Sequence, residues 1–177
     1  MTYTVVIGLD GAGFELLEPW LNAGELPNLA RIVDGGVAGD LRSVLPPVTS
    51  PNWKAYATGK NPGKLGVYWW YNVDTENERV YLPNDRYHDH DEYWELLDDR
   101  ERVGVVGVPT TYPPKSVGEC VVSGAPDADA TGFTSPSSLE TELRSEFDYR
   151  PTTRKSLKSG DVAAFEEVLD HVDTQFE

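Results

Sequence analysis

The chain is poor in cysteine and histidine, with one cysteine and three histidines among 177 residues. The single cysteine, Cys120, excludes an intrachain disulfide, and its place in an apolar run favours a small buried strand residue over a reactive thiol. No long apolar segment and no charged-then-apolar leader precedes the first predicted strand, so we expect no membrane span and predict a cytoplasmic protein. The length suits one domain with its own core.

Basic residues are scarce, because 15 lysines and arginines stand against 30 aspartates and glutamates, which gives a formal net charge of −15. The acidic residues are spread along the chain, and such scattered charge is typical of a solvated surface. Without a basic stripe that could release phosphate counterions, neither a nucleic acid polymer nor an anionic membrane is expected as a partner. High salt screens repulsion among carboxylates, so the composition predicts a halophilic protein, adapted to a salt-rich cytoplasm such as that of a haloarchaeon.

Two short segments carry the candidate chemistry. The first is an apolar, β-branched run at residues 4–9 that ends in Asp10 and a glycine, which predicts a buried parallel strand with a carboxylate at the carboxyl edge of the sheet. The second holds Thr49 just before Pro51, a residue favoured in the first turn of a helix. The Thr49 hydroxyl is therefore expected at a positive helix end, which suits a phosphoryl group.

The hydrophobic pattern alternates between the periods of strands and helices, which predicts an α/β fold with a doubly wound sheet. Strands are expected at residues 4–9, 37–44, 102–108 and 119–123, and a hairpin or excursion is expected between residues 67–71 and 79–82. Helices are expected at residues 16–23, from 26 to the glycines at 35 and 36, at 50–57, 93–100 and 138–147, and from 161 onward, with a loop at 58–63.

Four motifs in a fixed order carry a family resemblance: GLDG at residues 8–11, GELPNL at 24–29, PPVTSPNW at 46–53 and TGKNPGKLG at 58–66. Together they resemble the N-terminal part of the type I phosphodiesterase/nucleotide pyrophosphatase family, within the alkaline phosphatase superfamily. PTTYPP at 109–114 and VSGAP at 122–126 extend the similarity toward residue 136, over roughly three quarters of the chain, and the remainder is unspecific.

The resemblance implies a fold, a site and a reaction. The fold is an alkaline-phosphatase-like sheet flanked by helices, incomplete here, with residues 1–177 as the N-terminal portion of a single domain. The family binds two divalent metals, commonly zinc and with manganese as an alternative, so Asp10 is expected as a metal ligand and Thr49 as metal ligand and nucleophile. Asn52 is expected to donate its side-chain amide to a phosphate oxygen of a phosphate-ester small molecule.

The metal site is expected to be incomplete in this chain, because two metals need more ligands than Asp10 and Thr49 supply. The resemblance assigns none of His88, His90 and His171 to the metals, and it places the other Asp and His ligands in a C-terminal half of the same domain. The chain alone is therefore expected to be catalytically silent. The alternating histidines at 88 and 90 favour the solvated start of a helix over a transition-metal site.

Several alternatives stay open. A noncatalytic binding or assembly module would keep the first half of the fold. Thr49 argues against a mutase, which uses serine, and against a sulfatase, which needs a modified cysteine or serine.

Lys60 and Lys64 either steer an anionic substrate or line a solvated loop. The aromatic residues at 69–71 either form a wall of a leaving-group pocket or pack in the core, and core packing is favoured. The substrate, and whether it is a monoester or a diester, is left undecided.

Overall fold

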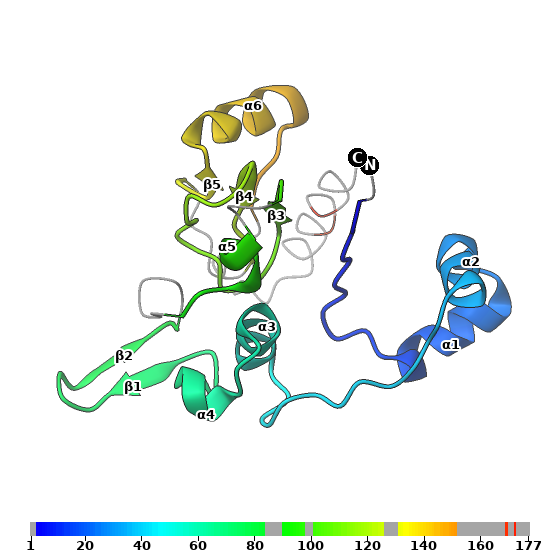
Figure 1. Ribbon diagram of the computed structural model, residues 1–177, viewed down its shortest axis with the longest axis horizontal. Helices are drawn as coiled ribbons and strands as arrows, with labels where there is room; N and C mark the ends of the chain where they lie inside the picture. Colours follow the sequence, from blue (N-terminus) through cyan, green and yellow to red (C-terminus); the bar gives the residue numbers. More distant parts are fainter. Residues whose placement is uncertain are drawn as a thin grey trace. The chain divides into compact units, whose positions relative to one another are not determined.

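The computed structural model describes residues 3–83, 90–97, 101–125 and 131–151, together with Leu169 and Val172. The chain divides into two compact units, Met1–Ser43 and Val44–Glu177, which are described separately below (Figure 1). Helices and small sheets both occur, so the predicted mixed α/β class is confirmed. In the part of the chain that the structure describes, no helix has the length and apolar character needed to cross a membrane.

The first unit contains two helices close to their predicted positions, α1 (Phe14–Ala23) and α2 (Pro27–Gly35). Helix α1 ends because Gly24 adopts the left-handed conformation at φ 75°. The amide of Glu25 then bonds back to the carbonyl of Trp20 at 3.0 Å, which satisfies an unpaired carbonyl of the last turn. Helix α2 begins at a proline, which needs no amide partner in a first turn.

The strands predicted at residues 4–9 and 37–44 are not formed, and this prediction was wrong. Their apolar side chains lie open to solvent, with Val5 77% and Ile7 74% exposed in the first segment and Leu41 96% exposed in the second. A strand is stable only when its backbone groups bond to a neighbouring strand. The first unit has no strand among its described residues, so these runs have no sheet to join within it.

The second unit begins with α3 (Thr49–Thr58) and α4 (Pro62–Leu65), followed by the antiparallel hairpin of β1 (Asn72–Asp74) and β2 (Arg79–Tyr81). The predicted hairpin is confirmed, but its first strand starts at residue 72 instead of lying at 67–71. Val67 is fully buried, so it belongs to the core and not to the exposed ribbon. Sequence reasoning missed α4, whose start is capped by the side chain of Asn61, which accepts a bond from the Lys64 amide at 3.0 Å.

A three-stranded sheet and two helices complete the described part of this unit. Their bounds are α5 (Tyr93–Leu97), β3 (Gly104–Val106), β4 (Cys120–Val122), β5 (Thr134–Ser135) and α6 (Ser137–Phe147). β3 and β4 pair in parallel and β5 joins β4 antiparallel, so the predictions for residues 102–108, 119–123 and 138–147 are confirmed and β5 was missed. The sheet is smaller than the predicted doubly wound one within the described residues. Cys120 is a strand residue as expected, although it is only half-buried.

Helices cover both faces of this sheet. Val121 packs in one core cluster with Ala57 of α3, Trp94 of α5 and Val105 of β3. The next residue, Val122, packs in a second cluster with Phe133, against which the apolar side chains of α6 lie. Successive residues of a strand point to opposite faces, so α3 and α5 lie on one face of the sheet and α6 on the other. The expected sheet flanked by helices is therefore present, and it holds α3 in place.

Candidate functional site

Thr49 and Asn52 lie together in the first turn of α3, where the sequence predicts them. The helix begins at Thr49 itself, and the residue at its N-cap position is Val48, whose carbonyl accepts the Asn52 amide at 3.0 Å. Thr49 is thus the first helical residue and not the cap. Both side chains are half-buried, and residues three apart are neighbours on a helix surface. The Thr49 hydroxyl and the Asn52 side-chain amide therefore lie at the positive end of the helix, which favours the binding of an anion.

The face of α3 beside this turn is anchored in the core. Its buried residues are Ser50, Pro51, Lys54 and Ala57, which recur at helical spacing. Ser50, directly after Thr49, is only 2% exposed. Since the residues on both sides of the turn are fixed, the backbone that carries Thr49 is held by packing and does not depend on a side-chain cap.

A buried ion pair, which sequence reasoning missed, fixes this helix further. The Lys54 ammonium donates to the Glu92 carboxylate at 2.7 Å, and the two side chains are 1% and 2% exposed. Burying a charge is costly unless an opposite charge and hydrogen bonds compensate it. The pair therefore ties α3 to the residue just before α5. The sequence signal was the position of Lys54, midway between inward-facing Pro51 and Ala57.

Aromatic residues extend the junction between α3 and α5. The Tyr56 and Tyr93 hydroxyls are 2.9 Å apart, and their rings meet edge to face with centroids 5.6 Å apart. Trp53 adds a second edge-to-face contact to Tyr56 at 5.8 Å. Desolvation, together with the hydrogen bond to Tyr56, raises the pKa of Tyr93 to about 12, so this phenol stays neutral at physiological pH.

Asp10 lies in the other unit, in an exposed turn just before α1. The turn is closed by a bond from the Ala12 amide to the Leu9 carbonyl at 3.3 Å, and Gly11 supplies the positive φ of 70°. The expectation that Asp10 ends a buried strand was wrong, since residues 4–9 form no strand. The carboxylate is nevertheless exposed at a glycine-bearing turn, and its chemistry suits a hard cation.

The one histidine inside the described residues, His90, is occupied by hydrogen bonds. Its Nδ1 lies 3.3 Å from the Lys60 ammonium and its Nε2 lies 3.2 Å from the Lys64 carbonyl. An ammonium only donates and a carbonyl only accepts, so Nδ1 is the acceptor and Nε2 carries the proton. Neither nitrogen is then open to a metal. His88 and His171 lie outside the described residues, within which no group of three or more His, Cys, Asp or Glu is arranged to hold a metal.

The aromatic residues after α4 do not fill the core as was favoured. Trp69 is 53% and Tyr71 46% exposed, and only Trp70 between them is half-buried. The core interpretation was therefore wrong for Trp69 and Tyr71. The helix predicted from residue 161 onward lies outside the described residues, apart from Leu169 and Val172, which are both helical.

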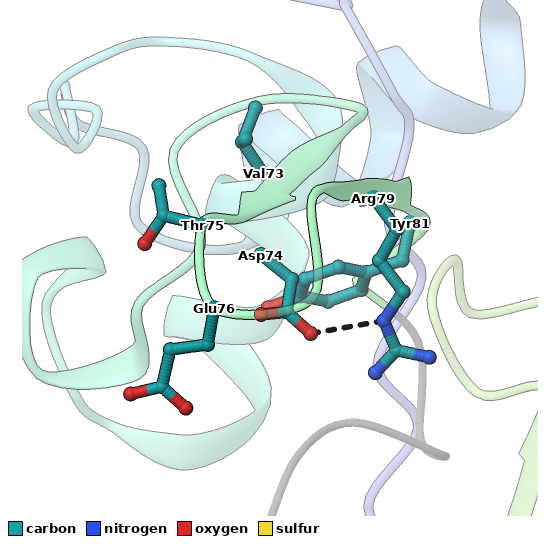
Figure 2. A pocket seen from close by; sticks show the side chains of 6 residues that line it. All are labelled: Val73, Asp74, Thr75, Glu76, Arg79 and Tyr81. Atoms are coloured by element: carbon teal, nitrogen blue, oxygen red, sulfur yellow. Dashed lines mark hydrogen bonds and ion pairs between the residues drawn. The ribbon is translucent and has the colours of Figure 1, made fainter.

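The hairpin of β1 and β2 encloses a hollow of about 330 Å³ (Figure 2). Figure 2 shows the Arg79 side chain turned toward the Asp74 carboxylate, which it meets at 2.9 Å. Hydrogen bonds from Asn77 and Arg79 lower the pKa of Asp74 to about 2. This carboxylate serves the turn itself, so the hollow follows from the hairpin's shape. The lining residues are Val73, Asp74, Thr75, Glu76, Arg79 and Tyr81.

A comparison with protein families extends the sequence resemblance. A family model described as type I phosphodiesterase / nucleotide pyrophosphatase matches residues 4–175. The match therefore continues past residue 136, into the part of the chain whose sequence had looked unspecific. No solved structure matches the chain.

Proposed function

Because the chain belongs to the type I phosphodiesterase/nucleotide pyrophosphatase family, we propose that it hydrolyses small phosphoester molecules through Thr49 as a metal-activated nucleophile. Membership supports the class, a phosphoester hydrolase. The assignment to Thr49 is supported chiefly by one observation: its hydroxyl lies in the first turn of a helix that is anchored in the core, with Asn52 beside it. A nucleophile on such a rigid element is held in a constant geometry relative to a bound phosphoryl group.

In the proposed reaction the Thr49 oxygen attacks phosphorus, the bond from phosphorus to the ester oxygen breaks, and the alcohol leaves. Water then attacks the phosphothreonine, which releases phosphate or a phosphomonoester and restores the hydroxyl. Asn52 donates its amide to a nonbridging oxygen, and the positive end of α3 stabilises the negative charge that develops there. Two divalent ions, zinc or manganese, would lower the pKa of the Thr49 hydroxyl and neutralise the phosphate.

The oxygen donors of Asp10 and Thr49 suit such ions but supply two ligands only, and a two-metal site needs further Asp and His residues. We place those ligands outside the residues named so far, in a C-terminal half of the same domain, as the resemblance implies. Under this proposal the 177-residue chain binds metal weakly and is catalytically silent by itself.

The proposal is tested by hydrolysis of bis-p-nitrophenyl phosphate and p-nitrophenyl phosphate with added zinc or manganese. The 177-residue chain and the complete gene product are assayed side by side, with a chelator as control. Metal-dependent release of nitrophenol by the complete gene product is expected, and the preferred ester distinguishes diesterase from monoesterase. A metal-loaded gene product that cleaves neither ester would refute the hydrolase and favour a noncatalytic module. Robust, Thr49-dependent turnover by the 177-residue chain would show that its own residues complete the ligand set.

Replacing Asp10 by alanine is expected to lower metal content without loss of stability. The side chain is exposed in a turn whose backbone bond and glycine remain, so the fold loses little. Losing a ligand weakens metal binding by about tenfold or more. Elemental analysis after dialysis measures the occupancy, and Asp40→Ala, at another exposed carboxylate of the same unit, is the control. Equal occupancy in both variants would rule out Asp10 as a ligand.

The excess of acidic residues leads to a salt prediction. If the net charge of −15 reflects a halophilic adaptation, molar potassium chloride screens repulsion among carboxylates and raises the melting temperature. Differential scanning calorimetry at fixed pH compares low salt with multimolar salt. A melting temperature that stays flat or falls contradicts the adaptation.

A further inference from the structure

The hydroxyl of Thr110 is buried without a hydrogen-bond partner. The residue is 1% exposed, and its Oγ1 is the buried side-chain polar atom that no donor or acceptor of the described chain satisfies. The hydroxyls around it are all bonded: Thr111 donates to the Val108 carbonyl at 2.7 Å, and Ser123 donates to the Thr111 carbonyl at 3.0 Å. An unsatisfied buried hydroxyl destabilises a fold, so this exception needs an explanation.

The backbone at the same residue is strained. Thr110 has φ 72°, in the left-handed region that β-branched residues rarely adopt. Its neighbours enforce this conformation, because the Gly124 amide bonds to the Val108 carbonyl at 3.2 Å and to the Thr111 hydroxyl at 3.3 Å. A glycine at position 110 would remove the strain and the orphan hydroxyl together. Strain of this kind is concentrated at ligand-binding and switch segments.

Thr110 also lies where α/β sheets bind ligands. It follows β3, and Ser123 and Gly124 follow β4, so these residues meet at the shared carboxyl edge of the parallel pair. Val105 and Val121 of this pair pack against Ala57 of α3, the helix that carries Thr49. The orphan hydroxyl and the candidate nucleophile thus belong to elements of one core.

We propose that Thr110 is a substrate-binding residue whose hydroxyl donates to a phosphoryl oxygen of the ester. This inference rests on the proposed function and adds a residue to its binding site. A neutral donor suits a chain of net charge −15, in which cations are scarce. Because Thr110 is 1% exposed, the ligand reaches it when the turn at residues 109–111 opens. Opening releases the backbone strain at Thr110, so this strain destabilises the closed turn relative to the open, ligand-bound form.

Stability separates this role from a structural one. Thr110→Val keeps the shape and the strain but removes the orphan hydroxyl, so the melting temperature of the ligand-free protein should rise by about 2 to 4 °C. The matched control, Thr111→Val, deletes a hydroxyl that both donates and accepts, and should lower the melting temperature by several degrees. A fall with Thr110→Val as large as that with Thr111→Val would overturn the proposal, because the hydroxyl would then have a structural partner.

Kinetics of the metal-loaded complete gene product test the binding role. Thr110→Val should raise KM for bis-p-nitrophenyl phosphate about tenfold or more with a smaller change in kcat, and Thr110→Ser should stay within about threefold of the wild type. An active wild type with unchanged KM in Thr110→Val overturns this inference alone, whereas an inactive wild type refutes the proposed function. In that second case, calorimetry with inorganic phosphate and zinc decides: a dissociation constant weakened about tenfold by Thr110→Val supports the site, and equal or absent binding overturns it.

Discussion

Thr49→Ala is expected to lower phosphodiester turnover by the metal-loaded gene product roughly a thousandfold or more, because in the proposed mechanism the Thr49 oxygen alone forms the phosphoenzyme. The fold should hardly change. Val48, not Thr49, occupies the N-cap position of α3, so the usual loss from removing the hydroxyl of a capping residue does not apply. The melting temperature should therefore stay within about 3 °C of the wild type. Steady-state kinetics and calorimetry on the same sample measure both quantities.

Two further variants make the result specific. Thr58→Ala removes the same hydroxyl at the other end of α3, where it donates to the Lys54 carbonyl at 2.7 Å, and should leave turnover within about twofold. Thr49→Ser retains a hydroxyl and should retain measurable turnover. Wild-type turnover by a verified Thr49→Ala protein would exclude Thr49 as the nucleophile, and equal losses in the two alanine variants would indicate a general effect on α3.

Local signals were enough to predict the helix position of the candidate site residues on α3. Thr49 and Asn52 are three residues apart around Pro51, and first-turn geometry follows from that spacing without knowledge of the rest of the chain. The same holds for β3, β4 and α6, whose hydrophobic periods match the observed elements. The strand prediction at residues 4–9 was wrong because strand formation depends on non-local contacts. An apolar run predicts burial, but pairing depends on a second strand, and no local pattern supplies one.

Contacts between residues that are far apart along the chain could not be predicted from the sequence. Lys54 and Glu92 are 38 positions apart, and each is a residue type usually found in water. The strain at Thr110 is also invisible, because a threonine after a proline is ordinarily extended or helical. Both features lie in the unit that contains α3, and both destabilise the chain unless something compensates them. Such local conflicts are expected mainly near functional sites.

Breaking the buried ion pair should have the largest effect on stability. Lys54→Met leaves the Glu92 carboxylate buried without its cation, and removing one partner of such a pair lowers the free energy of unfolding by about 3 to 5 kcal/mol. For a chain of this size the melting temperature should fall by about 6 to 20 °C. The double variant Lys54→Met with Glu92→Leu removes both charges and should recover most of the loss, because a well-packed apolar pair can replace a buried ion pair.

The exposed pair of Arg102 and Glu119 provides the matched control. Its nitrogen and oxygen are 2.8 Å apart, nearly the same distance, but the side chains are 86% and 56% exposed. Water solvates either partner alone, so Arg102→Met should change the melting temperature very little. Calorimetry on the three variants tests the difference that burial makes. If Lys54→Met and Arg102→Met behave alike, the pair is not buried in solution and does not hold α3. The other outcome is a melting temperature that falls with Lys54→Met and returns toward the wild-type value in the double variant. In that case, turnover that stays below the wild-type value in the double variant measures how far the ion pair positions the helix that carries Thr49.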